Sequence, residues 1–350
     1  MRGAAGVARV AAAGIAVLGI VATIAASFEP ASADAAAVPD MMLAVAMDRG
    51  GGPEVLTIHH LRVPKPGPGQ VLIAVHVAGI GVWEADMRQK PGARAHFPIV
   101  LGSDAAGTIA AVGPGVRAFK IGDAVYGIVN GSYAQYATAQ EAYVAHIPKG
   151  MAFNQAGALA ISGLSALQGI DEVLELKRGE TLIIHGATGA VGTLAVQLAK
   201  LRGARVLATA SSDAGMALLK RLGADAVVNG RTGDIAAAAR SFAPNGVDAV
   251  FGLAGGNALE RCIDALKSDG RGRVAYLYGM EPLPRPRFNI RMILYSFIPG
   301  RAELGRLNAA VEAAKLQVPI AAEYPLAQAA DAHRRLAAGH LNGKVVLRVQ

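Results

Sequence analysis

The sequence predicts an α/β protein in which a β-rich part precedes a doubly wound parallel sheet. Three observations predict this class. Short apolar or alternating runs separated by glycine and proline fill residues 42–148, strands and helices alternate strictly from about residue 154, and a small-residue loop joins the first of those strands to a helix. With 350 residues, 53% of them hydrophobic, the chain has enough material for two domains.

The β-rich part is recognised by turns that interrupt short strands. The segment VPKPGPGQVLIAVHVAG places a Pro/Gly turn before the alternating run 71–78. The segments GSDAAGTIAAVGPGV, KIGDAVYGI and GSYAQYATA continue the same pattern. They predict a compact β-rich unit.

The second part begins with a helix-like stretch at 154–176 and then alternates. The pattern predicts strands at 181–185, 205–210, 226–228, 247–253 and 273–277, and helices at 191–201, 214–222 and 259–266, with a further helix between the third and fourth strands. Such alternation predicts a parallel sheet with right-handed crossovers. The tail reads as a helix, a Gly/Asn turn and a final strand.

The loop between the first of these strands and its helix carries the main functional signal. It reads Ala187-Thr188-Gly189-Ala190-Val191-Gly192, which is G-x-G-x-x-G with alanine in the first place. In this context Gly189 would let the backbone approach a pyrophosphate at the helix N-terminus, and Gly192 would let helix and strand pack closely. We therefore predict a dinucleotide-binding Rossmann unit, against the alternative of a structural tight turn.

The end of the next strand indicates which dinucleotide binds. NAD sites usually carry Asp or Glu there, whereas RVLATA is followed by Ser211 and Ser212, which can donate to a 2′-phosphate. This favours NADP(H), although the serines could simply cap the following helix. Arg231 is a further phosphate partner or a solvated loop arginine, and Gly255 and Tyr278 follow strand ends where such sheets bind ligands.

Composition and missing motifs exclude several classes of partner, site and enzyme. The net charge is +8, but no block of five basic residues occurs, so we expect no nucleic-acid partner. Cys262 is the only cysteine, which excludes an internal disulfide and a cysteine-rich zinc site. No tyrosine has a lysine four places on, which excludes the Tyr-x-x-x-Lys pattern of short-chain dehydrogenases.

Residues 1–41 are interpreted as a signal peptide or membrane anchor. Arg2 and Arg9 precede an uncharged run at 10–28, and Ala31-Ser32-Ala33 forms an A-x-A cleavage signature. The arginines would leave the rest outside the cytoplasm, exported to the periplasm or anchored. The alternative is a cytoplasmic protein whose translation starts at Met41 or Met42.

Several segments from Met42 onward together resemble the zinc-independent NADPH:quinone oxidoreductases of the medium-chain dehydrogenase/reductase superfamily. They include PKPGPGQVLIAVHVAGI, FPIVLGSDAAGTIAAVGPGV, LIIHGATGAVGTLAVQLAKLRGARVLATASS and GHLNGKVVLRV. The resemblance implies a GroES-like catalytic domain at 42–160, completed by 297–350, and a Rossmann NADP-binding domain at 161–296. It also implies NADPH, reduction of a quinone or other conjugated carbonyl (an enone), and a homodimer. Ser165 would reach the nicotinamide amide, unless it is a mid-helix serine that bonds its own backbone, and Lys344 would also face the cofactor.

The same resemblance argues for chemistry without metal. Zinc-dependent relatives carry G-I-C-G and G-H-E, where this chain has Gly79-Ile80-Gly81-Val82 and Gly102-Ser103-Asp104. Without a Lewis acid, an electron-poor quinone or enone accepts hydride from nicotinamide more readily than an alcohol loses it. We therefore expect no metal.

Two departures from the family pattern bear on the site. The substrate loop N-P-V-D-x-Y is replaced by Gly81-Val82-Trp83-Glu84-Ala85-Asp86, where Trp83 stacks on a flat substrate or packs, and Glu84 or Asp86 relays a proton unless water does so. Gly215 stands where a lysine often lies, which weakens the preference for NADP(H). The alternative function is a non-catalytic NADP(H)-binding protein of the same fold.

Overall fold

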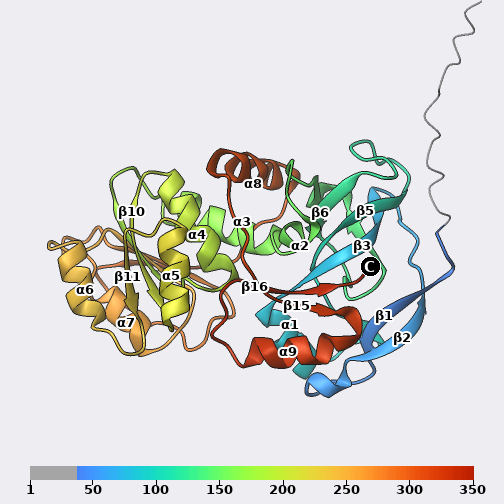
Figure 1. Cartoon of the computed structure of the whole chain (residues 1–350), viewed down its shortest axis with the longest axis horizontal. Helices are drawn as coiled ribbons and strands as arrows, with labels where there is room; N and C mark the ends of the chain where they lie inside the picture. The colour runs from blue at the N-terminus through green and yellow to red at the C-terminus, as the bar shows by residue number, and fades with distance from the viewer. Residues whose placement is uncertain (1–37) are drawn as a thin grey trace, which may run out of the picture. The chain divides into compact units, whose positions relative to one another are not determined.

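A computed structural model describes residues 38–350, in which a six-stranded sheet, a seven-stranded sheet and a three-stranded sheet occur (Figure 1). The interpretation of residues 1–41 as a leader falls almost wholly outside this range. Between residues 38 and 350, no helix combines the length and the apolar character needed to cross a membrane.

The six-stranded sheet has the strand order of a doubly wound nucleotide-binding fold. Its strands lie in the order β11 (Ala226–Asn229), β10 (Arg205–Ala210), β9 (Thr181–His185), β12 (Ala249–Gly252), β13 (Arg273–Leu277) and β14 (Arg291–Tyr295). Every neighbouring pair is parallel. All five residues of β9 are buried, as expected of a parallel strand covered on both faces. The order reverses between β9 and β12, and ligands bind at such a point, outside the carboxyl ends of the strands.

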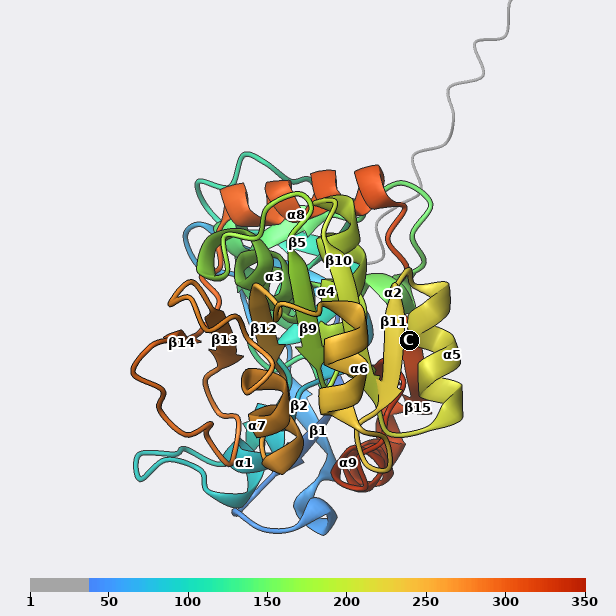
Figure 2. The same cartoon turned by 90° about the vertical axis from the view of Figure 1, so that its left-hand side faces the viewer.

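Helices cover both faces of this sheet (Figure 2). On one face α4 (Ala190–Leu201) and α5 (Asp213–Arg221) pack with Leu182, Ile184 and Val206, while α6 (Ile235–Phe242) and α7 (Asn257–Ile263) pack with Ile183 and Val250 on the other. Successive residues of β9 thus enter different cores, because side chains alternate across a strand. The predicted Rossmann architecture is confirmed.

The β-rich part forms the two other sheets. The seven-stranded sheet runs β15 (Ile320–Pro325), β16 (Lys344–Arg348), β3 (Gln70–Ile80), β5 (Asp104–Val112), β6 (Ala124–Ile128) and β8 (Val144–His146), with β7 (Tyr136–Gln140) also paired to β3. The smaller sheet runs β2 (Thr57–Arg62), β1 (Met41–Met47) and β4 (Ile99–Val100). The tail strand β16 pairs antiparallel with β3, which supports the proposed assignment of 297–350 to the GroES-like domain.

The remaining elements are helices and helical turns. They are η1 (Pro53–Val55), α1 (Val82–Gln89), η2 (Glu141–Tyr143), α2 (Phe153–Ala156), α3 (Ala160–Gln168), η3 (Gly169–Val173), α8 (Arg301–Ala314), η4 (Leu326–Gln328) and α9 (Ala329–Ala337). The helix-like stretch 154–176 is thus three short consecutive segments. The segment aligned with the family's substrate loop belongs mostly to α1, whose two buried residues, Glu84 and Arg88, are polar. Hydrophobic periodicity could not reveal a helix whose inner face is charged.

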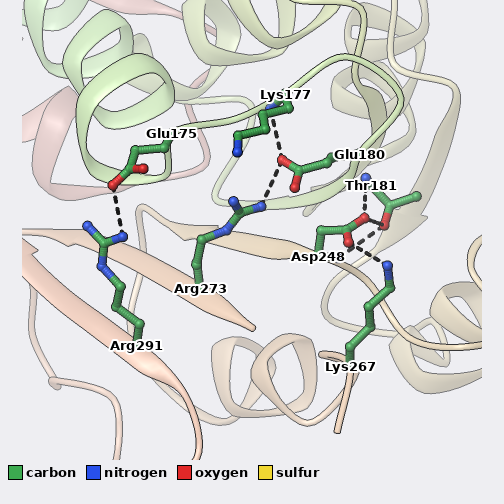
Figure 3. A network of polar contacts seen from close by, with 8 residues as sticks. All are labelled: Glu175, Lys177, Glu180, Thr181, Asp248, Lys267, Arg273 and Arg291. Carbon is green, nitrogen blue, oxygen red and sulfur yellow. Dashed lines mark hydrogen bonds and ion pairs between the residues drawn. The ribbon is translucent and has the colours of Figure 1, made fainter. Parts of the chain in front are cut away.

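A polar network fixes the amino ends of the central strands, at the edge opposite the predicted ligand site (Figure 3). Asp248, just before β12, accepts hydrogen bonds from the amide of Thr181 at 2.8 Å and from its hydroxyl at 2.7 Å, and pairs with Lys267. Arg273, at the start of β13, pairs with Glu180 at 2.8 Å. The network ties β9, β12 and β13 together where the strands begin.

Candidate active site

The glycine-rich loop lies where β9 ends and α4 begins. Gly189 is the N-cap of α4, so the helix N-terminus opens directly from the loop. A Cβ placed on Gly189 would meet only the carbonyl oxygen of Gly186, at 3.5 Å, which leaves the loop surface open for a ligand. A Cβ on Gly192 would instead collide with the backbone of Ala187. Gly192 therefore has the close-packing position that the motif predicts, and Gly189 has the open one.

The C-terminal tail crosses this loop. The amide of Gly343 donates to the carbonyl oxygen of Thr188 at 2.8 Å, and Gly343 forms a parallel bridge with Gly189. A Cβ on Gly215 would approach the methyl group of Thr188 at 2.8 Å and the Oδ1 atom of Asn342 at 3.2 Å. The tail, the glycine-rich loop and the start of α5 thus form one continuous surface.

Three polar side chains meet at the end of β10. His340 in the tail turns Nδ1 toward the hydroxyl of Ser211 at 3.0 Å and Nε2 toward Arg231 at 3.4 Å. The hydroxyl of Ser212 accepts a hydrogen bond from the amide of Gly215 and caps α5, while its own proton can still be donated, so its contact with a 2′-phosphate stays a prediction. We call Ser211, Arg231 and His340 the phosphate cluster. His340 could not be found from the sequence, because its contacts depend on the tail's return to the Rossmann unit.

The other expected cofactor residues lie on α3 and in the loops that follow β12 and β13. Ser165 is buried on α3, and its carbonyl oxygen accepts a hydrogen bond from Tyr295. Gly255 follows β12 and packs against Pro282, while Tyr278 follows β13 with 78% of its surface exposed. Gly255 and Tyr278 thus follow the carboxyl ends of parallel strands, where doubly wound sheets bind ligands.

A tryptophan occupies the space beside Gly81 and Ser103. The ring of Trp83 lies so close to Gly81 that a Cβ there would overlap it. Its indole N–H donates to the hydroxyl of Ser103 at 3.4 Å. The ammonium of Lys344 lies over the ring, 5.0 Å from its centroid. We call Gly81, Trp83, Ser103 and Lys344 the indole cluster.

Lys344 joins this cluster to the rest of the molecule. It is buried, and its ammonium donates to Asp104 at 2.8 Å and to the hydroxyl of Ser162 at 3.4 Å. The second oxygen of Asp104 accepts from the amide of Ile161 at 2.9 Å. A buried ion pair satisfied in this way connects β5, β16 and α3. Because Lys344 directly follows Gly343, the indole cluster adjoins the cofactor loop.

The two carboxyl groups proposed for proton transfer lie in different surroundings. Glu84 has no exposed surface and accepts hydrogen bonds from Gly81, Ser103 and Tyr133. Asp86 is exposed on the same helix. The structure therefore does not bring these two groups together. Their roles in proton transfer stay predictions.

Within residues 38–350, no group of three or more His, Cys, Asp or Glu side chains is arranged to hold a metal ion. At the indole cluster the neighbouring polar groups are a hydroxyl, an indole N–H and an ammonium. The indole N–H and the ammonium carry no lone pair that a metal could use.

Comparison with known proteins identifies the class and then the family. Residues 67–149 match the alcohol dehydrogenase GroES-like domain, and residues 222–347 match a family described as zinc-binding dehydrogenase. Together with the NAD(P)-binding loop, these matches define an oxidoreductase of the medium-chain dehydrogenase/reductase superfamily. The chain belongs to the quinone oxidoreductases of that superfamily: it is 33% identical to the quinone oxidoreductase of Rattus norvegicus over 318 residues, or 87% of this chain and 96% of the relative.

Solved structures agree with this placement. A mycobacterial protein in complex with NADPH matches with a TM-score of 0.79 and 30% identity, over 88% of this chain and all of that one. The Escherichia coli quinone oxidoreductase in complex with NADPH matches with a TM-score of 0.79 and 25% identity over the same shares. Structural neighbours of this fold are thus NADPH complexes, and the family binds NAD(P).

Proposed function

We propose that this chain reduces a quinone or enone with NADPH and without a metal ion. The observation that carries the metal-free part is the packing of Trp83 between Gly81 and Ser103. In the zinc-dependent relatives these two positions carry the thiolate and imidazole ligands. Here one has lost its side chain, the other is a hydroxyl, and an indole fills the space between them.

The cofactor would lie along the surface formed by the glycine-rich loop and the tail. The N-terminus of α4 at Gly189 would bind the pyrophosphate, and the phosphate cluster would bind the 2′-phosphate. Arg231 would supply the donors that the missing lysine at Gly215 does not, and His340, between Arg231 and Ser211, would orient both side chains. Bound there, NADPH supplies the hydride from C4 of its nicotinamide.

The chain's own residues would position the acceptor and stabilise the charge that develops on it. Lys344 is a buried cation beside the indole face, and its positive charge would stabilise the negative charge that develops on a carbonyl oxygen. An acceptor whose anion is already delocalised, as in a quinone or enone, needs less of such stabilisation than a saturated ketone. The proton would come from Asp86, from a route that includes Glu84, or from water.

An acceptor series tests this proposal. NADPH oxidation is followed with a quinone, an enone and a saturated ketone as acceptors. We expect turnover with the quinone or the enone, and little or none with the saturated ketone. A protein that binds NADPH but oxidises it with no acceptor would be the non-catalytic alternative.

We also propose that the chain forms a homodimer, as its family resemblance implies. β14 forms one edge of the six-stranded sheet and pairs only with β13 among the described strands. Leu294 on this strand and Phe288 before it are exposed apolar side chains. An open edge with apolar neighbours is suited to a second copy of the chain.

The proposed location is outside the cytoplasm, by export or by an uncleaved anchor. It rests on the arginines, the uncharged run and the A-x-A signature of residues 1–41. A start at Met41 or Met42 would instead give a cytoplasmic protein.

A further inference from the structure

The carboxyl group of Glu84 is held by three hydrogen-bond donors in the protein interior. Oε2 accepts from the amide of Gly81 at 3.0 Å and from the hydroxyl of Tyr133 at 2.6 Å, and Oε1 accepts from the amide of Ser103 at 2.9 Å. Glu84 and Tyr133 both have no exposed surface. The two amides can only donate, and with the phenol proton directed to Oε2 the set matches an ionised carboxylate, which accepts and cannot donate.

The hydrogen positions beyond Glu84 follow from the same bonds. Tyr133 has one hydroxyl proton, and its burial raises its pKa well above the ordinary value of 10, so the phenol stays neutral. Because that proton goes to Glu84, the phenol oxygen accepts from Nε2–H of His333 at 3.0 Å. Nδ1 of His333 then bears no hydrogen, and it has no partner within residues 38–350. Burial lowers the pKa of His333 to about 4, which agrees with a neutral ring.

The two backbone amides that Glu84 holds belong to the indole cluster. Gly81 supports one side of the Trp83 ring, and the hydroxyl of Ser103 receives the indole N–H. Glu84 makes no hydrogen bond to the indole itself, so it acts on the ring through its neighbours. Tyr133 and His333 hold the carboxylate from the other side, and His333 belongs to α9.

We propose that ionised Glu84 is a positioning residue that fixes Gly81 and Ser103, and through them Trp83, beside the acceptor. The acceptor's place rests on the proposed function, whereas the positioning of the indole does not. In this role Glu84 holds backbone amides and does not touch the acceptor. Tyr133 and His333 keep its hydrogen bonds ordered toward the ionised state.

Protonation of Glu84 should release this arrangement. A protonated carboxyl must donate through one oxygen: toward the amide of Gly81 or Ser103 it finds no acceptor, and toward Tyr133 it forces the phenol to donate to Nε2 of His333, which reverses the order of the network. Burial is the main cause that raises the pKa of Glu84 from 4.5 to about 7, while the bonds from Tyr133 and Gly81 and the charge of Lys344 lower it. The carboxylate is therefore ionised above about pH 7 and becomes protonated as the pH falls through that value.

The titration of Glu84 can be distinguished from that of the other charged groups around this network. Lys344 and Asp104 act on Glu84 by charge, and Arg88 acts on Tyr133 and His333. His333, with a pKa of about 4, and Tyr133, with a pKa well above 10, do not titrate between pH 5.5 and 8.5. Between those values, a titration that Glu84→Gln abolishes belongs to Glu84.

The fluorescence of Trp83 tests the positioning without any need for turnover, because Trp83 is the only tryptophan in the chain. In the wild-type protein we expect emission to change with a midpoint near pH 7. Glu84→Gln should abolish the change. Tyr133→Phe should raise the midpoint by roughly one pH unit, since it removes a hydrogen bond to the charged form. Glu312→Gln, at an exposed glutamate of α8, is the matched control and should leave the midpoint in place.

Steady-state kinetics then measure how the positioning affects reduction of the acceptor. Glu84→Gln should lower kcat/KM for the acceptor by roughly tenfold and flatten its acid limb, with the Kd of NADPH unchanged. Glu84→Asp keeps a carboxylate and should recover part of the loss. Far-ultraviolet circular dichroism confirms folding, and Tyr133→Phe carries the test alone if Glu84→Gln does not fold.

Three results would overturn the proposal: no wild-type emission change between pH 5.5 and 8.5, a change that persists in folded Glu84→Gln, or an unmoved midpoint in Tyr133→Phe. The failure of the proposed function looks different. In that case the fluorescence results hold as expected, and no acceptor is reduced by the wild-type protein.

Discussion

The amide of Gly343 donates a hydrogen bond of 2.8 Å to the carbonyl oxygen of Thr188, and this contact joins the C-terminal tail to the glycine-rich loop. Lys344 follows at once and pairs with Asp104 at 2.8 Å. Two adjacent residues of the tail therefore connect the surface for the dinucleotide with the indole cluster. A hydride donor and its acceptor must lie side by side, and this tail segment adjoins the surfaces proposed for both.

Substitution of Gly189 should remove cofactor binding and leave folding intact. In the free protein a Cβ there meets only the oxygen of Gly186 at 3.5 Å, so alanine fits the fold. Alanine and valine would both intrude on the pyrophosphate. We expect Gly189→Ala to weaken NADPH and NADH alike, and Gly189→Val to abolish both in calorimetry. Unchanged affinity in folded Gly189→Val would place the cofactor elsewhere.

Loss of Arg231 should weaken the binding of NADPH and leave the binding of NADH unchanged, because only NADPH carries the 2′-phosphate. We expect Arg231→Ala to weaken NADPH about tenfold, the range of one charge-assisted hydrogen bond at an exposed site. Arg240→Ala, at an exposed arginine of α6, is the matched control. Calorimetry with both cofactors checks the result, and an equal loss for both would remove Arg231 from the phosphate cluster.

Asp248 should matter for stability and leave cofactor affinity unchanged. Its removal leaves Lys267 and the amide and hydroxyl of Thr181 without their carboxylate, at the sheet edge opposite the cofactor surface. We expect Asp248→Ala to lower the free energy of unfolding by about 2–3 kcal/mol. Asp331→Ala, which breaks an exposed ion pair with Arg334, should cost less than about 1 kcal/mol. Urea unfolding measures both, and equal effects would contradict the role given to the network.

The leader interpretation predicts a processed or anchored amino end. Cleavage after Ala33 would leave a chain that begins at Asp34, and an anchor would retain Met1 in the membrane fraction. Amino-terminal sequencing of protein from fractionated cells distinguishes these outcomes. A chain that begins at Met41 or Met42 in the cytosol would overturn the proposal of export.

The sequence predicted the parts of the molecule whose signals are local. The strand–loop–helix at Gly189 and the buried strand β9 follow from patterns within a few residues. α1 could not be found in this way, because its inner face carries Glu84 and Arg88 in place of apolar residues. Nor could His340 be assigned to the phosphate cluster, since its partners Ser211 and Arg231 come from distant segments. Contacts made by the returning tail need the tertiary structure.

The proposed reaction transfers a hydride from NADPH to a conjugated carbonyl without metal. Its most direct test uses NADPH deuterated at the transferable C4 position, an enone acceptor and protein freed of metal by a chelator. An enone is chosen because hydride goes to carbon, where deuterium does not exchange with water. We predict one deuterium at the β-carbon of the saturated product, at an undiminished rate. Unlabelled product, or activity that disappears with the chelator and returns with zinc, would contradict the account.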